Sequence, residues 1–238
     1  MSVYVYAITS SECHPQLDDL HGVGEEAPPL RTVTEGALRA VVSDAPEDLR
    51  AKRRDLSAHH EVQERLLSER AAVLPMRFGL TAADDDAVRA ALSEHAELYS
   101  ERLAELEGRV EFNLKASEDE GVLLRQVIEE SDEVRRLNEA TRGGGGTYEE
   151  RLALGELVAQ EVGARQDSLT AEVTEALRPC ASAESAGGAT SEYFLNVSFL
   201  VDQGRVREFT SAAEKLAERY GPDVELRLRG PLPPYSFV

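Results

Sequence analysis

Short β-type segments alternate with long helical stripes along this chain of 238 residues, and this alternation limits the folds open to it. The segment from Val3 to Ile8 is rich in β-branched and aromatic residues, as strands are. The segment from Val88 to Leu106 instead repeats apolar residues at steps of three and four, the period of a helix that is buried on one side. Few strands and long amphipathic helices favour an α+β (layered α/β) fold, in which helices pack on small sheets.

Capping signals and apolar patterns place the other elements. Three pairs of residues have the spacing of a helix capping box: Thr81 with Asp84, Ser117 with Glu120, and Thr147 with Glu150. Pro75 lies in a short apolar run and indicates a strand end or an edge position. We expect strands at residues 3–8, 37–44, 109–116, 193–201 and 224–229, with a further short strand in the apolar run that holds Pro75. Helices are expected at about 46–70, 82–107, 117–137, 147–177 and 206–220.

The order of these elements predicts two domains, each a variant of the ferredoxin-like fold. Gly108 follows a helical stripe and precedes a strand pattern, so we place the boundary there. The expected domains are residues 1–108 and residues 109–238, the second with two long helices and a docked, proline-rich C-terminal tail. The glycine run 143–146 is expected to be a flexible connector between the two helices.

Composition excludes several classes of partner. Lys and Arg total 26 against 45 Asp and Glu, a formal net charge of −19. Nucleic acids and anionic membrane surfaces attract basic proteins, so this balance opposes both. No window approaches the ~18 uninterrupted apolar residues of a membrane helix. The first residues lack the basic start of a signal peptide, so we expect a cytoplasmic protein.

No catalytic, metal or cofactor site is predicted. His60 and Glu64 have the i, i+4 spacing that places an imidazole and a carboxylate on one helix face, but zinc needs three or four convergent ligands. We therefore interpret His60 as a partly buried helix residue, and His95 as part of the packed stripe around it. Neither a nucleophile elbow, a phosphate-binding loop nor a dinucleotide fingerprint is present in the sequence.

Packing alone explains two segments poorly. In LPMRFG, Leu74 to Gly79, a cation interrupts apolar residues at a strand end. Arg77 either extends over the sheet and pairs with a carboxylate or faces a partner. The candidate partner-binding residues are Pro75, Arg77, Phe78 and Gly79.

The second such segment is the uncharged C-terminal tail, GPLPPYSFV, which begins at Gly230. Its three prolines exclude a helix and favour an extended path. An apolar, stiff tail either docks on its own C-terminal domain and braces the two domains, or serves as a recognition peptide. The candidate docking residues are Pro231, Leu232, Pro233, Pro234, Tyr235 and Phe237.

Both segments, in this order of elements, resemble the gas vesicle protein GvpL/GvpF family. The matching stretches follow the family's order and span nearly the full chain: VYVYAI, AAVLPMRFG, EFNLKA, the helix start Tyr148-Glu149-Glu150-Arg151…Gly155-Glu156, and GPLPPYSF. Family members commonly carry an aromatic residue after the first proline of the ending, where this chain has Leu232. The matching residues do not separate the F type from the L type.

The resemblance implies a cytoplasmic accessory protein associated with gas vesicles, hollow shells built mostly from one small, very apolar subunit. It also implies two domains related to the ferredoxin-like plan and brings no catalytic residues. We expect the protein to bind the major shell subunit, to prevent its aggregation and aid assembly, and to contact other accessory proteins. The alternatives are a purely structural minor component of the shell and a small-ligand-binding protein with a pocket around His59, His60 and Arg77.

Overall fold

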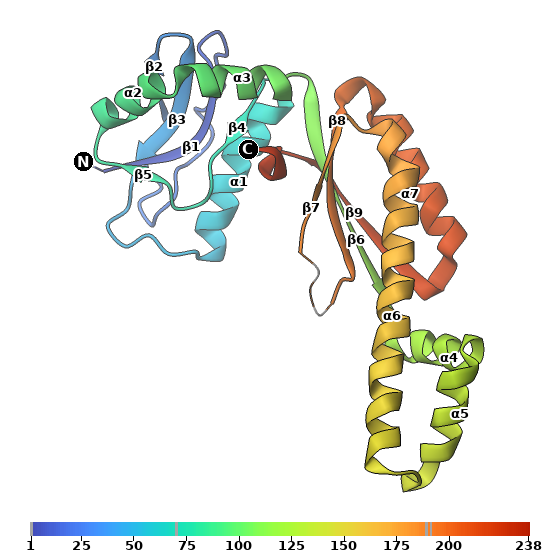
Figure 1. The fold of residues 1–238 in the computed structure, drawn as a ribbon. Helices are drawn as coiled ribbons and strands as arrows, with labels where there is room; N and C mark the ends of the chain where they lie inside the picture. Colours follow the sequence, from blue (N-terminus) through green and yellow to red (C-terminus); the bar gives the residue numbers. More distant parts are fainter. Residues whose placement is uncertain (1, 70, 189, 191) are drawn as a thin grey trace. The chain divides into compact units, whose positions relative to one another are not determined.

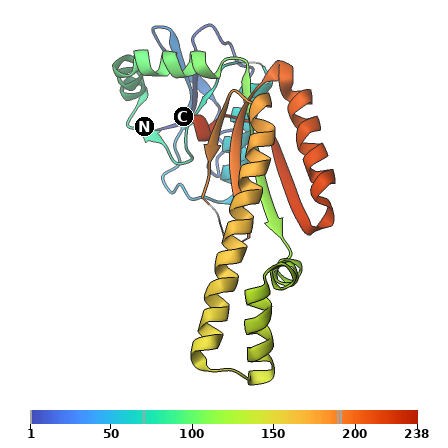
Figure 2. The same cartoon turned by 45° about the vertical axis from the view of Figure 1, so that its right-hand side comes forward.

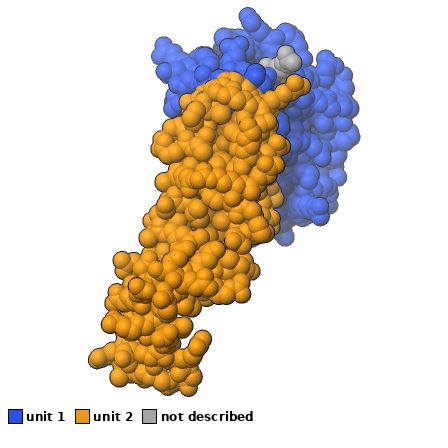
Figure 3. All heavy atoms as spheres, turned by 90° about the vertical axis from the view of Figure 1, so that its right-hand side faces the viewer, with its two compact units in different colours: residues 1–112, 200–204, 230–238 blue, residues 113–199, 205–229 orange. Residues whose placement is uncertain are grey.

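A computed structural model describes residues 2–69, 71–188, 190 and 192–238, and its contacts divide the chain into two compact units. Unit 1 holds residues 1–112, 200–204 and 230–238, and unit 2 holds residues 113–199 and 205–229 (Figure 3). This division differs from the expected domains, because the tail and residues 109–112 group with the N-terminal residues. The reason is that the tail packs and hydrogen-bonds within unit 1, as described below.

Unit 1 is built on one antiparallel sheet in which β1 is central (Figure 1). The strand order is β2-β3-β1-β4, and β5 also pairs with β1. The register of β1 and β3 runs from Val3 opposite Asp44 to Ser10 opposite Leu38. The strands are β1 (Val3–Ser10), β2 (Arg31–Glu35), β3 (Leu38–Asp44), β4 (Leu74–Pro75) and β5 (Thr81–Ala82).

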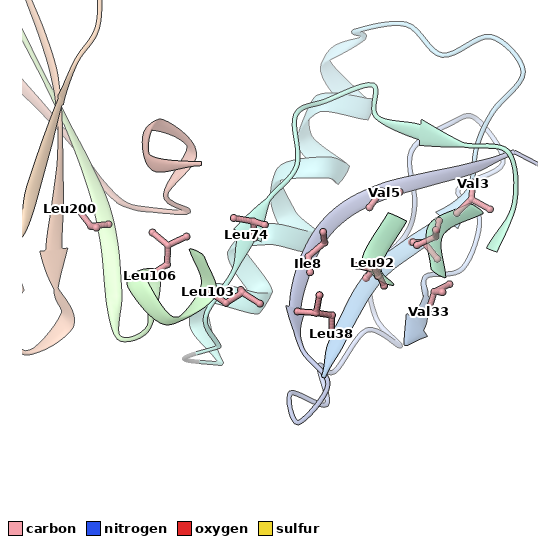
Figure 4. Packing of buried hydrophobic residues seen from close by; sticks show 13 residues of the cluster. Val3, Val5, Ile8, Val33, Leu38, Leu74, Leu92, Leu103, Leu106 and Leu200 are labelled. Carbon is pink, nitrogen blue, oxygen red and sulfur yellow. The ribbon is translucent and has the colours of Figure 1, made fainter. Parts of the chain in front are cut away.

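Strand β1 has an apolar core on each of its faces, because side chains alternate along a strand. Tyr4 and Tyr6 pack with α1 (Arg53–Ser68) on one face. On the other face, Val3, Val5 and Ile8 pack with α2 (Asp85–Glu94) and α3 (Ala96–Leu106), as Figure 4 shows. A shift of register between Val5 and Ala7 makes both Tyr6 and Ala7 part of the α1 side.

The structure corrects three details of the expected unit 1. The helix expected at 82–107 is interrupted at His95, which is exposed and not packed in the stripe. Its first turn is capped by Asp84, whose side chain accepts a hydrogen bond from the Ala87 amide at 2.8 Å, while Thr81 lies in β5. Helix α1 begins at Arg53 and not near residue 46, because Leu49 reaches the core from an irregular segment.

The second sheet, most of whose residues lie in unit 2, has the strand order β7-β8-β6-β9. Within unit 2, α7 and the C-terminal half of α6 share a core that includes Phe199 and Phe209, with ring centroids 5.4 Å apart. The strands are β6 (Arg109–Glu118), β7 (Ala183–Ala186), β8 (Leu195–Asp202) and β9 (Val224–Leu232). The helices are α4 (Glu120–Glu130), α5 (Asp132–Thr141), α6 (Tyr148–Leu177) and α7 (Val206–Tyr220).

The N-terminal half of α6 packs away from the sheet, against α4 and α5 (Figures 1 and 2). The helix expected at 117–137 is two helices, because the first ends at Ser131 and the Ser131 side chain caps the second. Asp119, and not Ser117, caps the first of them. The capping box of Thr147 and Glu150 is present as expected. In the part of the chain that the structure describes, no helix is both long and apolar enough to cross a membrane.

Candidate partner-binding surface

The LPMRFG segment leaves the sheet at its edge. Leu74 and Pro75 pair with β1, and the Met76 amide donates to the Tyr6 carbonyl at 3.0 Å. Pro75 lacks an amide hydrogen and is suited to this edge strand. The chain then turns, with the Leu80 amide donating to the Arg77 carbonyl at 3.3 Å and Gly79 at a φ of +95°. A glycine is favoured there because other residues rarely adopt a positive φ.

Buried polar side chains hold this turn in place. The Met76 carbonyl accepts hydrogen bonds from His59 Nε2 at 3.1 Å and from Gln63 Nε2 at 3.0 Å. The Tyr4 hydroxyl accepts from the Gly79 amide at 3.1 Å and lies 2.8 Å from His59 Nδ1. Satisfied buried networks of this kind fix a single local conformation. The backbone from Met76 to Gly79 is therefore anchored at both ends.

His59 is neutral within this network. A carbonyl can only accept, so the bond to Met76 places the ring proton on Nε2, and Nδ1 accepts from the Tyr4 hydroxyl. The imidazole is 4% exposed, and its burial lowers the pKa of His59 to about 4. Because both ring nitrogens are engaged within the fold, His59 has no free nitrogen for a ligand or a metal ion.

Gln63 connects the LPMRFG segment to the C-terminal tail. This fully buried side chain donates from Nε2 to the carbonyls of Tyr6, at 2.6 Å, and Met76. Its Oε1 accepts a hydrogen bond from the Tyr235 hydroxyl. The two segments that the sequence singled out thus meet at one glutamine of α1, and Figure 1 shows the C-terminus beside α1 and β4.

The rest of the tail is fixed within the same unit. The Ser236 amide and hydroxyl each donate to a carboxylate oxygen of Glu111 at 2.8 Å, and the Glu111 residue is 3% exposed. Phe237 packs against the core cluster of Figure 4. Burial raises the pKa of Tyr235 to about 12. Of the remaining candidate residues, Pro233 and Pro234 are buried, Leu232 is half-buried and Pro231 is exposed.

The candidate partner-binding residues differ in what they present to solvent. Pro75 is buried, and Phe78 is half-buried with its ring centroid 5.9 Å from that of Tyr4. Arg77 and Gly79 are exposed, and so is the neighbouring Leu80 at 45%. Arg77 forms no ion pair with any residue that the structure describes, so its charge is not neutralised by a neighbour.

The other histidines give no metal site. His60 Nε2 lies 3.1 Å from Glu64 Oε1, the i, i+4 pair that the spacing indicated, and His60 Nδ1 lies 3.4 Å from the Tyr235 hydroxyl. Across the described residues, no group of three or more His, Cys, Asp or Glu is arranged to hold a metal ion. His60 is partly buried, as the sequence predicted, whereas His59 is the fully buried histidine of α1.

Comparison with known proteins agrees with this architecture. The profile of the family described as gas vesicle synthesis protein GvpL/GvpF matches residues 2–238. Gas vesicle protein F of Streptomyces sp. (strain CB03234) is 48% identical over 243 residues, with full coverage of both chains. The chain belongs to the GvpL/GvpF family. Gas vesicle protein L of the same organism is 29% identical over 99% of this chain and 92% of the relative.

Across its described residues the chain has an α+β fold with two antiparallel sheets and seven α-helices, and solved structures of GvpF proteins have the same fold. The crystal structure of GvpF from Anabaena sp. PCC7120 superposes with a TM-score of 0.85 at 21% identity, covering 99% of this chain and 97% of that one. GvpF from Microcystis aeruginosa gives a TM-score of 0.82 at 23% identity, with 99% and 98% coverage. The chain therefore has the fold of these structures, and through its family it is a gas vesicle accessory protein.

The sequence did carry signals for the residues that were missed. Tyr4 and Tyr6 alternate on a predicted strand, and buried tyrosine hydroxyls require hydrogen-bond partners. That rule predicts a polar side chain on the helix covering Tyr4, which is His59. The Tyr6 hydroxyl instead pairs with Ser43 Oγ at 2.9 Å and the Val23 amide at 2.8 Å, so the rule gives no signal for Gln63. The link from Gln63 to Tyr235, by contrast, joins positions 172 residues apart, and no local pattern indicates it.

Proposed function

We propose that this protein binds the small apolar major shell subunit of gas vesicles, prevents its aggregation and aids its assembly. Family membership supports the gas vesicle context. The observation that carries the binding surface is Arg77, an exposed cation on an anchored turn that pairs with no carboxylate among the residues described. Phe78, Leu80 and the edge strand β4 add apolar side chains and a sheet edge beside it.

The charge of the chain suits a binding partner of an aggregation-prone subunit. Exposed apolar strands and helices associate with one another until they are paired. A partner with a net charge of −19 keeps its complexes apart by electrostatic repulsion. The sheet edge at Leu74–Pro75 offers strand addition as the mode of contact, and other accessory proteins are the remaining expected partners.

We further propose that the protein is of the F type. The chain is 48% identical to gas vesicle protein F and 29% identical to gas vesicle protein L of one Streptomyces strain. A larger identity to the F protein of the same organism supports an F role. Complementation of a strain that lacks either protein tests it, and rescue of the L deletion alone would contradict the proposal.

Both units are proposed to be variants of the ferredoxin-like plan. Their strand orders are β2-β3-β1-β4 and β7-β8-β6-β9. In both sheets the second and third strands along the chain are neighbours, the third pairs with the first, and the first also pairs with the last. In unit 1 the connection from β1 to β2 is a loop and not a helix, whereas in unit 2 α4, α5 and α6 connect β6 to β7. Experimental coordinates with these strand orders and directions would test the proposal.

A pull-down with the purified shell subunit tests the binding surface. The wild type is expected to retain the subunit, and Arg77→Ser is expected to retain at least about tenfold less, the effect of losing roughly 1.4 kcal/mol. Arg89→Ser is the matched control, because Arg89 is a half-exposed surface arginine that pairs with Asp86 at 2.6 Å. Equal retention by all three proteins would exclude Arg77 from the contact.

A further inference from the structure

Two strongly exposed large apolar side chains lie one turn apart at the start of α6. Tyr148 is 73% exposed and Leu152 is 51% exposed. Residues four apart on a helix are neighbours on one face, so these two side chains form a single apolar surface. Tyr148 and Leu152 are thus positioned to anchor a partner.

The start of α6 is fixed rather than frayed. The Thr147 hydroxyl accepts from the Glu150 amide at 3.1 Å, and the Glu150 side chain accepts from the Thr147 amide at 2.7 Å. Arg151 donates to the carbonyls of Gly145, at 3.2 Å, and Gly146, at 2.9 Å. The helix therefore presents Tyr148 and Leu152 in a defined orientation, which lowers the entropy lost on binding.

The face that carries Tyr148 and Leu152 is open, whereas another face of α6 is packed. The buried core of α4 and α5 is contacted by four residues of α6, Leu154, Leu157, Val158 and Val162, and Figure 2 shows α5 running beside α6. The open face continues through Gly155 and Gly163. A Cβ atom added at either glycine would meet nothing within 4 Å, so another helix can approach this face closely.

The charges beside this face define its partner. Glu149, Glu156 and Asp167 follow one edge of the face and are exposed. None of the three pairs with a basic side chain within the described residues. The stretch from residue 148 to 163 has one arginine against four glutamates. That arginine, Arg151, is turned to the glycine carbonyls, so the face is acidic.

We propose that the α6 face formed by Tyr148, Leu152, Gly155 and Gly163 binds an amphipathic helical segment of a partner, with an apolar stripe edged by Lys or Arg. The apolar stripe covers Tyr148 and Leu152, and the basic edge pairs with Glu149 and Glu156. This inference rests on the proposed function, because it takes the partner to be a gas vesicle component. It describes the chemistry of that partner and assigns it a contact in unit 2. A basic partner suits this face better than an antiparallel second copy, which would place the two acidic edges against each other.

A peptide-binding assay tests this surface without the shell subunit. The probe is a synthetic 18-residue helix with leucines on one stripe and lysines at its edges, titrated into labelled full-length protein at 150 mM salt. The double variant Y148S/L152S keeps every charge and is expected to bind at least about tenfold more weakly, since it removes two exposed apolar anchors. The control Leu98→Ser removes an equally exposed leucine (50%) in unit 1 and is expected to bind as the wild type does.

Two results would overturn the inference. One is equal affinity of Y148S/L152S and the wild type for the lysine peptide, which would reduce the contact to general charge attraction. The other is equal affinity of the wild type for a matched peptide with glutamates in place of lysines. Failure of the wild type to retain the shell subunit while the peptide results hold would instead count against the proposed function alone.

Discussion

His59 makes the folded chain sensitive to acid at the scale of one residue. Its pKa is about 4 in the fold, because burial opposes the charged form and His60 adds a like charge, and about 6.5 in the unfolded chain. The unfolded state therefore binds more protons between these values, and stability present above pH 6.5 is lost as the pH falls toward 4. We expect a loss of about 2–3 kcal/mol in the free energy of unfolding.

Urea unfolding at pH 7 and pH 5 measures this effect. His59→Gln removes the titrating group and is expected to reduce the pH dependence. His95→Gln, at an exposed position, is expected to leave it as in the wild type. The same difference between pH 7 and pH 5 in His59→Gln as in the wild type would show that other groups carry the acid sensitivity.

Tyr235 contributes through its hydroxyl. Tyr235→Phe leaves Gln63 Oε1 without its donor in the tail, and an unsatisfied buried acceptor costs roughly 1–2 kcal/mol. Chemical denaturation measures this loss. Tyr148→Phe is the matched control, since the Tyr148 side chain is 73% exposed and its change is expected to lie within about 0.5 kcal/mol of zero. Equal stability of both variants would mean that the Tyr235 bond contributes nothing.

At the scale of elements, the tail enters unit 1 at a position where only glycine fits. A Cβ atom at Gly230 would lie 2.4 Å from Cδ1 of Phe112, and Phe112 is 2% exposed. Gly230→Ala is therefore expected to lower the free energy of unfolding by about 1–3 kcal/mol. Gly163→Ala, in open space within α6, is expected to raise it by roughly 0.5–1 kcal/mol. Thermal melts of the two variants should move in opposite directions.

Removal of the tail from Leu232 to Val238 tests its structural role. The deletion loses the packing of Phe237 and the two bonds from Ser236 to the buried carboxylate of Glu111. We expect the melting temperature to fall by several degrees, the scale of a few kcal/mol in a domain of this size. An unchanged melting temperature together with loss of shell-subunit binding would instead identify the tail as a recognition element.

Elements with a strong period were predictable from the sequence, and the breaks between them were not. The apolar stripes of α6 and α7 and the alternation in β1 and β6 placed those elements correctly. The interruptions at His95 and Ser131 contain neither glycine nor proline, so the apolar period continues across them. Strand β7 has the small-residue composition of a loop, and its pairing with β8 is a tertiary effect.

At the scale of the whole molecule, the sequence identified the right segments but not their arrangement. LPMRFG and the tail stood out because a cation and a proline-rich apolar ending fit poorly into ordinary packing. Their meeting at Gln63 depends on contacts between positions far apart along the chain. The tail was expected on the C-terminal domain, because a chain end usually lies near the elements that precede it. Its hydrogen bonds place it in unit 1.

We propose that the protein is a partner of the major shell subunit, and co-expression of the two proteins is the first experiment to make. The quantity to measure is the fraction of shell subunit that stays soluble and co-purifies with the full-length protein. We expect this fraction to rise well above that of the subunit expressed alone, and we expect Arg77→Ser to lower it. A subunit that remains insoluble beside folded wild-type protein would contradict the account and favour a structural role within the shell.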